Sequence, residues 1–163
     1  MIKQYLAYQI PHSYDAVDHQ LISFVNRYGL NILRLSLATV FLWFGLLKVL
    51  NVSPVTPLAE DLIPGITTGT FVFALGIMEI GVGMSLVFKK LLKVSIAIMV
   101  THLASTFSLL ITLQETMIND SNPFLLTLEG EFIIKNLVLI AGALAVASAV
   151  CAERITKNDR VNQ

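Results

Sequence analysis

Four stretches of mainly apolar residues constrain this chain more than any other feature of its sequence. They cover residues 30–50, 69–88, 94–113 and 132–151. A helix of about 20 apolar residues crosses the hydrocarbon core of a bilayer. None of the four stretches shows the polar stripe of a helix on the surface of a soluble protein. The sequence therefore predicts an all-α integral membrane protein, a four-helix transmembrane bundle within residues 30–151.

The composition agrees with a protein that faces lipid. Of the 163 residues, 55% are hydrophobic and 13% are charged, whereas roughly a quarter of the residues of a soluble domain are charged. Basic and acidic residues balance at 11 each, so the chain has no excess of positive charge for nucleic acid. The lipid bilayer is the expected partner.

The basic residues outside the spans predict the orientation. Short loops rich in Lys and Arg stay cytoplasmic. These residues occur before the first span, between the second and third, and after the fourth: Lys3, Arg27, Lys89, Lys90, Lys93, Arg154, Lys157 and Arg160. Loops 51–68 and 114–131 contain no Lys or Arg, and all of their charged residues are acidic. We expect both termini in the cytoplasm and both acidic loops on the opposite side of the membrane.

The segments outside the spans carry patterns of their own. Residues 1–29 form a cytoplasmic N-terminal segment, and 152–163 form a cytoplasmic tail. Within 14–28, apolar residues at helical spacing predict an amphipathic helix on the membrane interface: Val17, Leu21, Phe24, Val25 and Tyr28. Loop 114–131 is too apolar for a solvated linker, so its apolar residues either pack on the bundle or lie among the outer headgroups: Met117, Ile118, Phe124, Leu125 and Leu126.

Five ionisable residues lie inside the spans: Arg34, Lys48, Glu79, His102 and Lys135. Glu79 is the most constrained, because its short side chain cannot reach either membrane surface from mid-span. A lone ionised carboxylate at that depth is costly, so Glu79 must be protonated, hydrogen-bonded or paired. We expect an interior polar cluster of Glu79 with Arg34 and His102. Glycines 76, 81 and 83 would let a neighbouring helix approach closely.

Lys48 and Lys135 lie near the outer ends of the first and fourth spans. Each can extend its amine to the headgroups. If their helices are neighbours, the two amines instead form a small positive pocket for an anion, a lipid phosphate or the carboxylates of Glu129 and Glu131. Two roles stay open for the charged residues as a set. They either fix the register of the helices or serve transport or redox chemistry.

The inventory of side chains argues against several chemistries. Cys151 is the only cysteine, which argues against thiol–disulfide exchange within the chain. His102 is the only histidine in the spans, which argues against haem ligation by two histidines. The sequence has no clustered metal ligands and no Gly-rich phosphate loop. We therefore assign no catalytic residue, no metal and no resident cofactor. Cations, one acid and apolar walls suit an anion, a proton relay or a quinone head group.

Four sequence stretches resemble DoxX-like membrane proteins, in the reactive-chlorine-resistance branch (RclC/YkgB-like). They are "LRLSLATVFLWFGLLKVLNVSPVTP", "LGIMEIGVGMSLVF", "STFSLLITLQE" and "GEFIIKNLVLIAGALAVAS". The first is the most specific, since the Arg, the "FLWFGLLK" run and "SPVTP" agree in order and spacing. The resemblance covers most of residues 30–150. Loop 51–68 is shorter than is usual in that branch.

The resemblance implies a bacterial inner-membrane protein, non-catalytic, with a role in oxidative or reactive-chlorine stress. It also marks Arg34, Lys48, Glu79 and Lys135 as polar positions typical of the family. The alternative it implies is a membrane subunit of a quinone-linked oxidoreductase of DoxX type. Both a homo-oligomer and a complex with a partner membrane subunit are compatible with it.

Overall fold

The computed structural model describes residues 12–54, 56–57, 68–89, 91–119, 122 and 124–161, with side chains for 18–54, 56–57, 69–89, 91–119, 122 and 124–152. In chain order the helices are α1 (His12–Val49), α3 (Thr68–Phe88), α4 (Leu92–Thr106), α5 (Leu109–Thr112), α6 (Gln114–Met117) and α7 (Leu128–Val161). Within the described residues, the only β-type pairing is one isolated antiparallel bridge, Ile118 with Leu126. The all-α prediction is confirmed.

Four helical segments are long and apolar enough to cross a membrane: Asp18–Val49, Gly69–Phe88, Leu92–Thr112 and Leu128–Ala152. Each overlaps one of the four predicted spans. The chain is therefore a multi-pass membrane protein with four candidate spans. Their orientation across the membrane stays a prediction from the charges.

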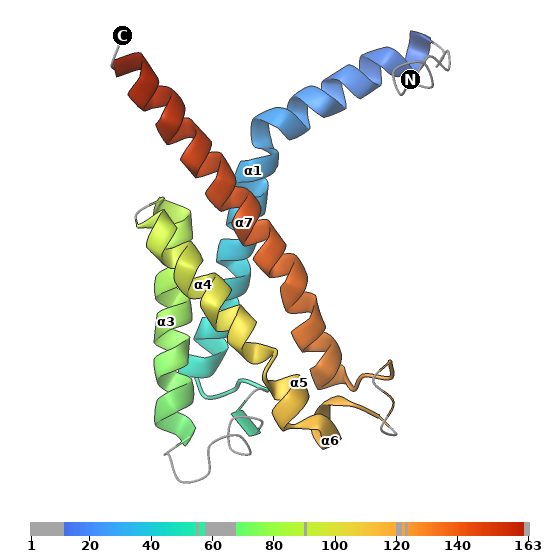
Figure 1. The fold of residues 1–163 in the computed structure, drawn as a ribbon, viewed down its shortest axis with the longest axis vertical. Coiled ribbons are helices and arrows are strands. Elements are labelled where there is room, and N and C mark those ends of the chain that lie inside the picture. Colours follow the sequence, from blue (N-terminus) through green and yellow to red (C-terminus); the bar gives the residue numbers. More distant parts are fainter. Residues whose placement is uncertain are drawn as a thin grey trace.

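The four long helices form a bundle of antiparallel neighbours. α1 packs against α3 and α7, and α4 packs against the same two helices. Figure 1 shows the start of α1, the end of α7 and the short α3–α4 turn toward one end of the bundle, and α5 and α6 at the other. The core consists of apolar side chains from all four helices, among them Leu37, Phe41, Leu86, Met99 and Ala143. Large apolar side chains such as Trp43 and Val138 are exposed, as expected of a surface that faces lipid.

α1 and α7 are longer than the predicted spans. The predicted interfacial helix and the first span are one continuous helix, because a single Gly29 does not stop a helix that has no proline between residues 12 and 49. Figure 1 shows α1 bending so that its N-terminal part points away from the bundle. The C-terminal tail predicted at 152–163 is likewise helical as far as Val161.

α1 ends at a well-formed stop signal. The amide of Val52 donates to the carbonyl of Leu47 at 3.0 Å, and the amide of Asn51 donates to the carbonyl of Lys48 at 3.1 Å. This pair of bonds is the Schellman motif, which needs a left-handed residue directly after the helix. Asn51 takes that conformation, with φ 56°, and asparagine tolerates it better than most residues. The first span therefore ends directly beyond Lys48.

The third predicted span, 94–113, is interrupted. α4 ends at Thr106 and α5 begins at Leu109. Between them the amides of Phe107 and Ser108 donate to carbonyls three residues back rather than four. This is the tighter 3₁₀ pattern, which marks hinges and strained stretches when it occurs within a helix. The chain therefore changes helix type about one turn after His102.

The connection from α6 to α7 is a compact hairpin. The amide of Asn119 donates to the carbonyl of Leu125 at 2.7 Å, and that of Thr127 donates to the carbonyl of Met117 at 3.0 Å. Met117 is fully buried, whereas Phe124 is 92% exposed. The expected packing on the bundle is therefore present for Met117, whereas the position of Phe124 among the outer headgroups stays a prediction.

Candidate functional site

Glycines bring the C-terminal half of α1 into close contact with the middle of α3. A Cβ atom at Gly45 would lie 2.8 Å from the carbonyl oxygen of Gly76, and a Cβ at Gly76 would lie 2.8 Å from that of Gly45. Gly83 is packed in the same way against Leu42. Gly81, expected to help this approach, is exposed, and a Cβ added there would have no neighbouring atom within 4 Å. Segments 45–49 and 76–80 therefore lie across from each other, with no room for larger side chains at the two central glycines.

Lys48 and Glu79 form a buried ion pair at this contact. The Lys48 Nζ donates to Glu79 Oε1 at 2.8 Å and to Oε2 at 2.6 Å. Lys48 is 7% exposed and Glu79 is 5% exposed. Lys48 lies in the last turn of α1, yet its side chain lies in the interior instead of extending to the headgroups. The ammonium group therefore neutralises the carboxylate of the second span.

His102 of α4 completes the cluster. Its Nε2 lies 3.0 Å from Glu79 Oε1, the oxygen that also accepts from Lys48. The imidazole side chain is 17% exposed. Three helices thus place an ammonium and an imidazole in contact with one carboxylate. The expected contact of Glu79 with His102 is present in this arrangement.

The expected contact of Glu79 with Arg34 was wrong. The Arg34 Nη1 instead donates to the carbonyls of Leu86 and Val87, at 2.5 and 3.1 Å, in the last turn of α3. The last carbonyls of a helix lack partners within it and carry partial negative charge, so a buried guanidinium is well placed there. The Nε of Arg34 has no hydrogen-bond partner within the described residues. Arg34 acts as a cap on α3, near the end of the bundle opposite Asn51.

The expected positive pocket of Lys48 and Lys135 does not form. Lys135 is exposed and reaches Glu131, one turn earlier on α7, with a 3.4 Å separation between Nζ and Oε2. The Lys48 amine is instead paired with the carboxylate of Glu79. Of the two carboxylates considered for Lys135, the structure places that of Glu131 in contact with it. An exposed pair of this kind contributes little to stability.

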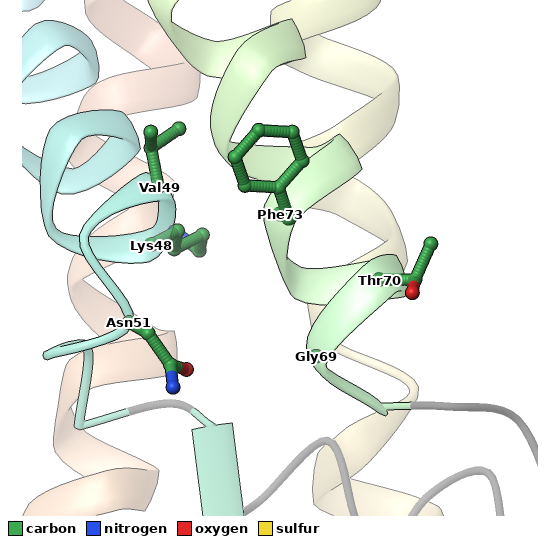
Figure 2. Close-up of a pocket in the computed structure, with 6 residues that line it drawn as sticks. All are labelled: Lys48, Val49, Asn51, Gly69, Thr70 and Phe73. Carbon is green, nitrogen blue, oxygen red and sulfur yellow. The ribbon is translucent and has the colours of Figure 1, made fainter.

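An open pocket with a volume of about 330 Å³ reaches Lys48 from the side where α1 ends and α3 begins. Figure 2 shows its lining, which comes from the end of α1 and the first turns of α3: Lys48, Val49, Asn51, Gly69, Thr70 and Phe73. The lining combines one cation, two neutral polar side chains and apolar walls. Lys48 is thus shared between the interior cluster and the pocket.

A second interior polar contact joins α4 to α7. Asn136, 6% exposed, donates from Nδ2 to Thr106 Oγ1 at 2.9 Å, and Thr106 Oγ1 donates to the carbonyl of Leu103 at 2.6 Å. This pair was not predicted from the sequence, because uncharged Asn and Thr are unremarkable in a span. One signal was present: Thr106 follows His102 by four residues, so the two side chains project from the same face of α4.

The cluster suits proton or anion chemistry better than metal chemistry. No group of three His, Cys, Asp or Glu side chains that could hold a metal occurs in the part of the chain that the structure describes. The carboxylate and the imidazole can share a proton along their 3.0 Å contact. The ammonium can attract an anion that enters the pocket.

The chain has no match among family models, curated proteins or solved structures. The likeness to DoxX-like proteins therefore remains a prediction from the quoted stretches. The plain description is a multi-pass membrane protein with four candidate spans and a Lys48–Glu79–His102 cluster in its interior.

Proposed function

We propose that this protein acts in the inner membrane against oxidative or reactive-chlorine stress, by binding and moving a proton or a small anion at the Lys48–Glu79–His102 cluster. One observation supports this role above all: a carboxylate buried within a span is held by both an ammonium and an imidazole. Ionisable residues at such depth are typical of proton relays and ion pathways. The stress role itself comes from the sequence resemblance.

The hydrogen-bond geometry suggests how a proton would act. An imidazolium at His102 can pass the proton on its Nε2 to Glu79 Oε1, 3.0 Å away. The carboxylate then becomes a neutral acid, and its attraction for the Lys48 ammonium falls. Because Lys48 also lines the pocket, the released ammonium can turn outward, toward an anion. Proton binding and anion binding would then be coupled through one side chain.

The interruption of the third span is a point at which α4 can shift relative to the other helices. The 3₁₀ stretch begins about one turn after His102, and interrupted spans adjoin the binding sites of many transporters. The hydroxyls of Ser105 and Thr106 donate to the carbonyls of His102 and Leu103, which offers these carbonyls partners where the regular ladder is broken. A shift of α4 at this point would change the contact between His102 and Glu79.

Transport in vesicles tests the role of the cluster. The purified protein is reconstituted into vesicles with a trapped pH dye, and in parallel with a trapped chloride-sensitive dye. We expect the wild type to dissipate an imposed proton or chloride gradient faster than empty vesicles, and Glu79→Gln to match the empty vesicles. Glu131→Gln is the matched control, because it is the same isosteric change at an exposed ion pair, and it should behave as the wild type. Equal rates for Glu79→Gln and wild type would refute the pathway.

Survival of cells under hypochlorite tests the stress role separately. A strain that lacks the protein should be complemented by the wild type and by Glu131→Gln, but not by Glu79→Gln at equal protein level. If the wild type does not restore survival, the stress role is wrong whatever the vesicles show.

A quinone-linked oxidoreductase subunit is the second candidate, favoured by the lining of the pocket. Phe73 offers an exposed aromatic ring, and Lys48 offers a donor for a quinone carbonyl. Quinone extracted in stoichiometric amounts from the purified protein, and lost in Phe73→Ala, would favour this candidate. A protein that purifies without quinone and still moves protons or chloride would favour the first.

A further inference from the structure

We infer that residues 18–32 of α1, here called the arm, bind a lipid surface by lying on it at the end of the bundle where α7 ends and α3 turns into α4. α1 has 38 residues, about 57 Å at 1.5 Å per residue. The hydrocarbon core of a bilayer is only about 30 Å thick. Arg34 is the first residue of α1, among those with described side chains, that is buried against other helices. The arm therefore precedes the part of α1 that belongs to the bundle.

The arm differs from the spans in having two distinct faces. Apart from Leu30, close to the span, its large apolar side chains fall on one side of the helix and are all exposed: Leu21, Ile22, Phe24, Val25, Tyr28 and Ile32. The opposite side carries His19, Gln20, Ser23, Asn26 and Arg27. Asn31 lies at the border of the two faces, and Asp18, the first residue of the arm, is the one charged residue on the apolar side. A helix that crosses lipid is apolar all round, whereas one that lies at the interface is divided in this way.

The apolar face of the arm continues into a lipid-facing surface. Going along α1 at intervals of three or four residues, Tyr28, Ile32 and Leu35 lie on one face and are exposed, and Trp43 extends the same face within the span. Because α1 bends away from the bundle (Figure 1), the side of the span that faces lipid becomes the side of the arm that faces the membrane. This continuity favours lipid over a second copy of the chain as the occupant.

The arm has little charge with which to select lipids. Arg27 is the only Lys or Arg between residues 14 and 28, and its guanidinium lies over the Tyr28 ring at 5.4 Å. Polybasic segments are what anionic headgroups attract. The arm therefore binds by insertion of apolar side chains, and a zwitterionic surface serves as well as an anionic one.

Spin labels on the full chain test this arrangement. Cys151, the only cysteine, is changed to Ser, and single cysteines are introduced as Phe24→Cys, Asn26→Cys and Val138→Cys. Val138 is 74% exposed within the fourth span and serves as the deep reference. The labelled proteins are reconstituted into vesicles of phosphatidylcholine, with and without phosphatidylglycerol, and probed with oxygen and with a water-soluble nickel chelate.

We expect oxygen, which concentrates in lipid, to relax the label at position 24 more than the water-soluble nickel chelate does. At position 26 the nickel chelate should relax the label more than oxygen does. The Phe24 label should be shallower than the Val138 label, and no depth should change with phosphatidylglycerol. A Phe24 label freely accessible to nickel would overturn lipid binding. Spin–spin broadening at Phe24, with low access to both reagents, would assign the face to a second copy. Insertion only in the anionic vesicles would overturn the apolar mode of binding.

Discussion

Lys48 and Glu79 are each tolerated in the interior only because the other is there. Both are less than a tenth exposed, and the carboxylate accepts from one ammonium through both of its oxygens. A buried pair adds little net stability over apolar residues of the same size, but removing one partner leaves an uncompensated charge. The two residues should therefore behave as one unit in mutagenesis.

We predict that Glu79→Gln and Lys48→Met each destabilise the protein in detergent by roughly 3–5 kcal/mol. The double variant should recover much of that loss, because no charge is then stranded beside His102. Chemical unfolding curves of the four proteins give the coupling energy directly. Glu131→Gln, at the exposed pair on α7, should change stability by less than about 0.5 kcal/mol. Losses that simply add in the double variant would show that the two side chains do not interact.

The sequence predicted that Glu79 has a buried partner but pointed to the wrong cation. Measured along the predicted spans, Arg34 lies nearer to the depth of Glu79 than Lys48 does, but the long lysine side chain carries its amine several ångströms along the helix. The choice also needs the faces of two helices, which apolar composition does not reveal. A usable signal was the matching pair "GLLK" (45–48) and "GIME" (76–79). Each charge follows, by three residues, one of the glycines at which the helices meet.

At the scale of secondary-structure elements, the third span is interrupted after α4, and at the same place a hydrogen bond links it to α7. Asn136 of α7 donates to the hydroxyl of Thr106, the last residue of α4. The predicted span 94–113 had the right length, because length and composition suffice to recognise a span. At its interruption, three hydroxyls donate to carbonyls three residues back, those of Ser105, Thr106 and Ser108, and such bonds compete with the regular helical ladder. Such bonds cannot be assigned from composition.

We predict that Thr106→Ala destabilises the protein by roughly 1 kcal/mol, the usual size of a hydrogen bond between spans. The change removes the acceptor of the buried Asn136 amide. Thr106→Ser keeps the hydroxyl and should stay close to the wild type. Thermal unfolding in detergent compares the variants. If Ser and Ala variants unfold alike, the methyl group of Thr106 matters rather than its link to Asn136.

At the scale of the whole molecule, the fold determines which helix ends lie together at each end of the bundle. The distribution of basic residues then predicts which of these two ends faces the cytoplasm. The start of α1, the end of α7 and the α3–α4 turn lie toward one end (Figure 1). The basic residues outside the spans occur in the segments at that end. The positive-inside rule then predicts that this end is cytoplasmic.

Reporter fusions check this orientation. Fusions after Val52 and near Asn119 should report an external location, and fusions near Lys90 and Asn158 a cytoplasmic one. The alternation follows from four crossings by consecutive antiparallel helices. A cytoplasmic signal at Asn119 would contradict the four-span topology, and a complete reversal of all four signals would contradict only the charge rule.

The position of the ion pair also bears on how the protein is made. Lys48 and Glu79 belong to consecutive spans, so both leave the ribosome before His102 does. Each charge alone opposes entry into lipid, but the two meet as soon as α1 and α3 form a hairpin, in which the glycines fit them together. We expect the two spans to enter the bilayer as one unit, already neutralised. His102 would then join a finished pair, so that the cluster is assembled in the order in which its residues are synthesised.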